Sequence, residues 1–152
     1  MGKYVVFEVS GAKFGLRMEH VSSIEVMQPM TRVPGSKPYV KGVVHLRGKL
    51  IPVIDLHLYF DREPTSASGT SKIIVLLNEN EYIGILVDEA NHVMSIPNEM
   101  IEPMAQIFGN EESPYFEGIA NLEESIIGIL SVEQLLKAAR DTMSKLKLRT
   151  AY

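Results

Sequence analysis

An internal duplication constrains the fold of this chain more than any other feature of its sequence. Residues 39–60, YVKGVVHLRGKLIPVIDLHLYF, follow the same pattern as residues 115–136, YFEGIANLEESIIGILSVEQLL, at a constant separation of 76 positions. Each stretch predicts a strand, a short turn, a second strand rich in β-branched residues, and a helix cap, at Asp55 and at Ser131. The sequence therefore predicts two versions of one small β unit.

The segments that precede these stretches also correspond, at a separation of 69 positions. Residues 5–7 match residues 74–76, and residues 14–16 match residues 83–85. Because the separation grows from 69 to 76, the second copy carries an insertion, which falls among prolines and a glycine after residue 96. Loops tolerate insertions far better than strands do, so we expect a loop there.

Short strands, glycine-bearing turns and two equal halves predict a mostly β protein with two small, closed or nearly closed barrels. We expect the first barrel at residues 1–64, a Ser- and Gly-rich linker at 65–71, and the second barrel at 72–132. A capping box at residues 131–134 and helical apolar spacing predict a C-terminal helix and tail at 133–152. A lone half of about 65 residues would be marginally stable, so we expect the halves to share an apolar core.

Composition excludes several classes of protein. The net charge of −4 argues against a nucleic-acid partner, and the absence of cysteine excludes a disulfide scaffold and a thiolate metal site. No apolar run approaches the roughly 18 residues of a membrane-spanning helix, and no signal peptide opens the chain. We therefore expect a cytoplasmic protein without a lipid anchor or membrane span of its own.

The sequence predicts no catalytic residue, no metal and no cofactor. Acidic pairs at residues 88–89 and 123–124 fall at a strand end and a turn, where solvated acids are common, and no serine has the context of a nucleophile. Four histidines lack the spacing of metal ligands. They are His20, His45, His57 and His92.

Eight methionines are more than core filling usually needs. Two interpretations stay open, because methionine both fills gaps in a core and forms adaptable apolar docking surfaces. The residues concerned include Met18, Met27, Met30, Met94, Met100 and Met104. Their exposure in the folded protein distinguishes the two.

The two copies differ most clearly at the turn inside each stretch. The first copy has Arg47 followed by glycine and lysine, whereas the second has Glu123 followed by glutamate and serine. Arginine carries five donors in a rigid fork and can hold several carbonyls or a carboxylate, which glutamate cannot. Arg47 is therefore either a binding residue or a solvated cation of the turn.

The string YVKGVVHLRGKLIPVIDL, together with TRVP before it and IGILVDEANHVMSIP after it, resembles the CheW family of adaptors of bacterial chemotaxis. The resemblance covers the chain from about residue 4 to residue 139. It implies two SH3-like five-stranded β-barrels on a common core and a scaffold without catalysis. Such adaptors couple chemoreceptors to the histidine kinase CheA.

The resemblance also implies where the partners bind. The cytoplasmic tip of a methyl-accepting chemoreceptor would contact the groove between the barrels, and the regulatory domain of CheA would contact exposed strands of the second barrel. The protein would reach the membrane only through receptors. The receptor contact maps to Val21, Gly42, Arg47 and Ile74, and the kinase contact to Ile83 and Ile85.

Two other functions remain open at this point. One is the adaptor half of a protein that also carries a phosphorylatable receiver domain, although no further βα pattern with an acidic pocket follows in this sequence. The other is a β-barrel that binds a small molecule, which would raise its own melting temperature in the presence of that ligand alone.

Overall fold

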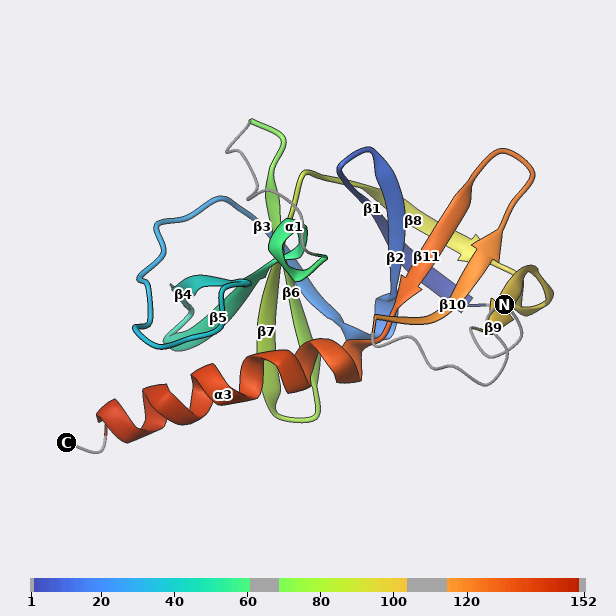
Figure 1. Ribbon diagram of the computed structural model, residues 1–152. Coiled ribbons are helices and arrows are strands. Elements are labelled where there is room, and N and C mark those ends of the chain that lie inside the picture. Colours follow the sequence, from blue (N-terminus) through green and yellow to red (C-terminus); the bar gives the residue numbers. More distant parts are fainter. Residues whose placement is uncertain (1, 61–68, 104–114, 151–152) are drawn as a thin grey trace.

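The fold consists of two β-sheets and a long C-terminal helix (Figure 1). The computed structural model describes residues 2–60, 69–103 and 115–150, so most of the expected linker lies outside it. Two α-helices, α1 (Leu56–Tyr59) and α3 (Val132–Thr150), and two 3-10 turns, Met18–His20 and Asn98–Met100, complete the described elements. None of the described helices is apolar and long enough to span a membrane.

Each sheet combines strands from both copies of the duplicated unit. The six-stranded sheet has the order β8 (Glu89–Ile96), β1 (Gly2–Val9), β2 (Ala12–Arg17), β11 (Ile126–Leu130), β10 (Phe116–Asn121) and β9 (Ile101–Pro103). The five-stranded sheet has the order β3 (Val21–Val26), β6 (Lys72–Asn78), β7 (Glu81–Val87), β5 (Lys49–Asp55) and β4 (Val40–Leu46). The mostly β fold with two sheets and a C-terminal helix is therefore confirmed.

The sheets do not coincide with the two halves of the sequence. The β1–β2 hairpin of the first copy joins the second copy through a parallel pairing of β2 with β11. The β6–β7 hairpin of the second copy joins the first copy through a parallel pairing of β7 with β5. The strand pairing thus differs from the expected division into residues 1–64 and 72–132, because the copies exchange their first hairpins.

The strand registers confirm the duplication. Val6 faces Gly15 in the first hairpin, and the residues 69 positions later, Val75 and Gly84, face each other in the β6–β7 hairpin. The pairings β4–β5 and β10–β11 also share one register, including a bulge. The six-stranded sheet has one strand more because β9 pairs with β10 over three residues. At the equivalent edge of the five-stranded sheet, Thr31 forms only an isolated bridge with Val43 of β4.

The expected shared apolar core is present between the sheets. Equivalent residues of the two copies meet in it, including Val5 with Ile74 and Leu16 with Ile85. The α3 helix adds Leu135 to the same cluster. Each sheet also has a smaller apolar cluster of its own. The shared cluster and the exchanged hairpins hold the two sheets together as one body.

An aromatic seam lines the edge of the shared core. The Tyr59 ring makes edge contacts with Tyr39 and Tyr115, with ring centroids 5.6 and 5.1 Å apart. Tyr39 and Tyr115 are equivalent residues of the two copies, so the seam joins the copies at matching positions. Burial, together with the smaller effects of the neighbouring Tyr115 and Tyr39 hydroxyls, raises the pKa of Tyr59 to about 12.

We predict that Tyr59 weakens the fold at alkaline pH. Because its folded pKa lies above the ordinary value of 10.0, the stabilisation it supplies is complete below pH 10.0 and is lost as the pH rises toward about 12. Tyr59→Phe, which cannot ionise, should therefore lose less free energy of unfolding over this range than the parent protein. Urea denaturation at a series of pH values measures this, and equal losses would contradict it.

We also predict that Gly42 and Gly118 are required for stability at equivalent sites. A Cβ atom at Gly42 would lie 2.6 Å from the Thr31 carbonyl oxygen, and one at Gly118 would lie 2.7 Å from that of Glu102. Since backbone cannot move aside easily, each Gly→Ala change should cost roughly 1–3 kcal/mol of unfolding free energy.

Gly69→Ala is the matched control, because a Cβ atom at Gly69 meets nothing within 4 Å. Chemical denaturation of the three variants compares them directly. Equal stabilities would show that the close approach at Gly42 and Gly118 is not required.

Candidate functional site

Strand β3 forms one edge of the five-stranded sheet, since within the described part of the chain it pairs only with β6. Its side chains at Ile24 and Val26 point to the same side and are 45% and 63% exposed. We call these two residues the β3 strip. Exposed apolar groups on an edge strand favour contact with another protein.

The turn that joins β4 to β5 is strained at Arg47. Leu46 pairs with Lys49, so the loop has two residues, and both have positive φ: 49° at Arg47 and 79° at Gly48. Glycine adopts this backbone conformation readily, whereas for other residues the left-handed region is less favourable by about 1–2 kcal/mol of conformational free energy. The equivalent Glu123 does not have a positive φ. Only the first copy therefore places a cation on a strained tip.

Arg47 connects this turn to β3. Its Nη2 atom lies 3.4 Å from the Oε2 atom of Glu25, which is mostly buried, while the Arg47 side chain is 74% exposed. The pair links the β4–β5 hairpin at one edge of the sheet to β3 at the other. Because a guanidinium has five donors, Arg47 keeps donors that face solvent next to Glu25, whose side chain points to the opposite side of β3 from Ile24 and Val26.

The other expected receptor-contact residues lie around the same strand or beneath it. Val21 opens β3 and is half-buried, opposite Leu76. Ile74 pairs with Ile24, so their side chains lie on the same face of the sheet, but Ile74 is fully buried in the shared core. Gly42 is buried on β4, where it lets the segment containing Thr31 approach.

The expectation that Ile83 and Ile85 lie on exposed strands is wrong. They are 2% and 0% exposed and belong to the shared core. The hairpin exchange explains this, because β7 lies between β6 and β5 in the middle of the five-stranded sheet. Neither side chain is available to another protein in this fold.

Sequence reasoning missed Glu25 and the β3 strip. Alternation along β3 was visible in the sequence, but it did not show which face of the strand stays uncovered. A second signal was available, since Ile24 corresponds to Val93, and both are apolar and exposed. Two copies that keep an apolar residue at one exposed strand position indicate a surface rather than a core.

The methionines divide between the two interpretations. Met27, Met30 and Met94 pack against the smaller apolar clusters, which supports gap filling. Met18 and Met100 are exposed, which leaves them available for docking. Met104 lies outside the described residues.

One cluster of polar groups joins the two sheets. The Nε2 atom of His57 lies 2.8 Å from Oδ1 of Asp88, and its Nδ1 atom lies 3.2 Å from the Ser10 hydroxyl. The Ser10 backbone N–H also donates to Oδ2 of Asp88 at 2.8 Å. Ser10 sits in the β1–β2 turn and His57 in α1, so the cluster fastens the six-stranded sheet to the end of β5.

We predict that Arg47→Gly stabilises the protein by about 1 kcal/mol, because glycine adopts the positive φ without strain. Glu123→Gly is the matched control at the equivalent position, where glycine only adds chain entropy to the unfolded state and should lower stability. Urea denaturation distinguishes the two. If Arg47→Gly lowers stability as much as Glu123→Gly, the turn is not strained.

Comparison with known proteins agrees with this geometry. A family model described as the CheW-like domain matches residues 3–140. The chemotaxis protein CheW of Bacillus subtilis (strain 168) is 32% identical over 134 residues, 88% of this chain and 86% of that protein. The CheW protein of Klebsiella aerogenes is 27% identical over 136 residues, 90% of this chain and 82% of that protein. The crystal structure of the scaffolding protein TtCheW from Thermoanaerobacter tengcongensis matches with a TM-score of 0.78 at 30% identity, over 86% of this chain and 89% of that one. The chain belongs to the CheW-like domain family.

Proposed function

We propose that this protein is a non-catalytic adaptor that couples methyl-accepting chemoreceptors to the histidine kinase CheA on the cytoplasmic side of the membrane. The observation that carries the proposal is the position of Arg47. A strained turn holds this cation against Glu25 of β3, the edge strand that also carries the exposed apolar β3 strip. Backbone strain of this kind is kept at sites where geometry serves binding.

The receptor tip would bind along β3. A helix from the tip would cover the β3 strip with its apolar face, while Arg47 would hold a carboxylate or carbonyl at its edge. Val21, at the start of the same strand, would extend the contact. Ile74 and Gly42 would act from beneath, because they fix the strand and the turn without reaching the surface.

The adaptor would work as a rigid body with partners on separate faces. The exchanged hairpins and the shared core make a shift of one sheet relative to the other costly. A movement of the receptor would therefore reach the kinase as a change in contacts rather than a deformation of the adaptor. Contacts that are weak singly would become strong together in an array.

We predict that Arg47→Glu prevents incorporation into complexes with receptor-bearing membranes and CheA. The new carboxylate would face Glu25 and could no longer donate to a receptor, so we expect at least a tenfold loss of co-sedimentation and of kinase stimulation. Lys37→Glu is the matched control, because it makes the same charge change at an exposed residue of the segment between β3 and β4.

Melting curves of both variants establish that they remain folded. Arg47→Gly provides a second measurement, since it removes the cation without adding a repulsive charge and is expected to keep the fold. Unchanged assembly by the folded Arg47→Glu and Arg47→Gly variants would exclude the role given to Arg47.

A further inference from the structure

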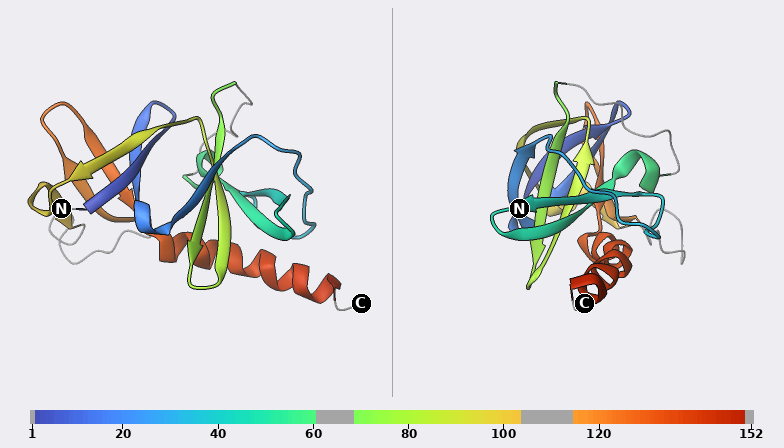
Figure 2. Two further views of the ribbon diagram at one scale, coloured as in Figure 1. Left: turned by 180° about the vertical axis from the view of Figure 1, so that it is seen from behind. Right: turned by 90° about the vertical axis from the view of Figure 1, so that its left-hand side faces the viewer.

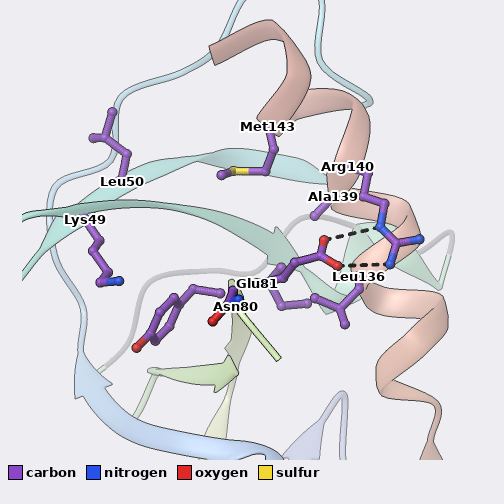
Figure 3. A pocket seen from close by; sticks show the side chains of 10 residues that line it. Lys49, Leu50, Asn80, Glu81, Leu136, Ala139, Arg140 and Met143 are labelled. Atoms are coloured by element: carbon purple, nitrogen blue, oxygen red, sulfur yellow. Dashed lines mark hydrogen bonds and ion pairs between the residues drawn. The ribbon is translucent and has the colours of Figure 1, made fainter. Parts of the chain in front are cut away.

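A groove lies beneath α3, against the five-stranded sheet (Figure 3). Its floor comes from the start of β5 and of β7, with Leu50 and Ile83, and α3 forms the opposite wall. Arg140 of α3 binds Glu81 at the rim through two hydrogen bonds of 3.1 and 3.2 Å. The groove therefore holds an amphipathic helix by apolar contact and one forked ion pair.

The six-stranded sheet has a second groove, in which residues 11–14, 125 and 126 correspond to residues 80–83, 49 and 50 of the first. It lies over β2 and β11, which pair in parallel with the same register as β7 and β5. Leu50 corresponds to Ile126, and Ile83 corresponds to Phe14. The complete lining of this β2–β11 groove is Gly11, Ala12, Lys13, Phe14, Glu124, Ser125, Ile126 and Gly128.

The two grooves differ in the helix that covers them. Helix α1 is the counterpart of the start of α3, since Asp55 caps α1 as Ser131 caps α3, and Phe60 corresponds to Leu136. Phe60 stacks on Phe14 at 5.1 Å between ring centroids. However, α1 ends at Tyr59, whereas α3 continues for almost four more turns. Among the described residues, no helix lies over the rest of the β2–β11 groove.

The lining of the open groove suits a helix. Small residues, Gly11 and Ala12, stand where the covered groove has Asn80 and Glu81, and Lys13 stands where it has Tyr82. Ile126 is 65% exposed, which is more than any other large apolar side chain described. Glu124 supplies an anion and Lys13 a cation at the lining.

We propose that the β2–β11 groove docks an amphipathic helix of a partner protein, in the position that α3 occupies on the five-stranded sheet. The helix would present apolar side chains at i, i+3 and i+7, as Leu136, Ala139 and Met143 do in α3. A basic residue beside this stripe would pair with Glu124, as Arg140 pairs with Glu81. The proposal rests on the equivalence of the grooves and is independent of the receptor contact at β3.

A peptide of residues 131–144 is the probe, because α3 has this chemistry. A covalent cross-link between the side chains at positions 133 and 137 holds the peptide in a helix. Both positions are exposed on α3, so the cross-link stays off the apolar face. The full-length protein, labelled with nitrogen-15, is titrated with the peptide. We expect saturable shifts at Gly11, Ile126 and Gly128, and at least a tenfold weaker affinity for the folded variant Ile126→Glu.

Val93→Glu is the matched control, since it places the same charge at an exposed apolar residue of the same sheet outside the groove. It should bind as the parent protein does. Glu124→Lys should weaken binding, and a peptide with Arg140→Glu should restore it. Shifts confined to Leu50 and Asn80, equal effects of Val93→Glu and Ile126→Glu, or no saturable binding would each overturn the proposal.

Discussion

The parallel pairing of β5 with β7 and of β2 with β11 is the constraint on which the rest of this structure depends. It brings a hairpin of each copy into the sheet of the other, so equivalent apolar residues of both copies meet in one core. A unit of about 65 residues alone would be marginal, and the exchange removes that weakness by making each sheet depend on the other. Figure 2 shows the result, in which α3 leaves the six-stranded sheet and packs beneath the five-stranded one.

The duplication made most of the fold predictable. The matched offsets predicted the hairpins, their turns, the caps at Asp55 and Ser131, and the shared core. They could not predict the exchange, because both copies carry the same local pattern. A strand with Phe14-Gly15 and one with Ile83-Gly84 suit the same neighbour, and only the chain's three-dimensional path decides between them. Ile83 and Ile85 were expected on a surface because the resemblance implied it, whereas the exchange places them in the core.

The candidate site was predictable only where the copies differ in chemistry. Charge reversal between Arg47 and Glu123 marked the turn, since charge is visible in a sequence. The β3 strip was not marked, because exposure of Ile24 depends on β3 having one neighbouring strand rather than two. Glu25 was missed for the same reason, because its ion pair with Arg47 joins the two edges of the sheet, and the local pattern does not specify which strands form those edges.

Duplication followed by local divergence explains how one fold can serve several contacts. Each groove beside a parallel pair keeps its strand register, since a one-residue slip would turn apolar side chains outward and damage the core. Turns and helix lengths are under no such restraint. The first copy has a strained arginine tip and a helix of one turn, whereas the second has a long helix and an ordinary turn. The core therefore preserves the symmetry, and the surface, where binding occurs, is free to break it.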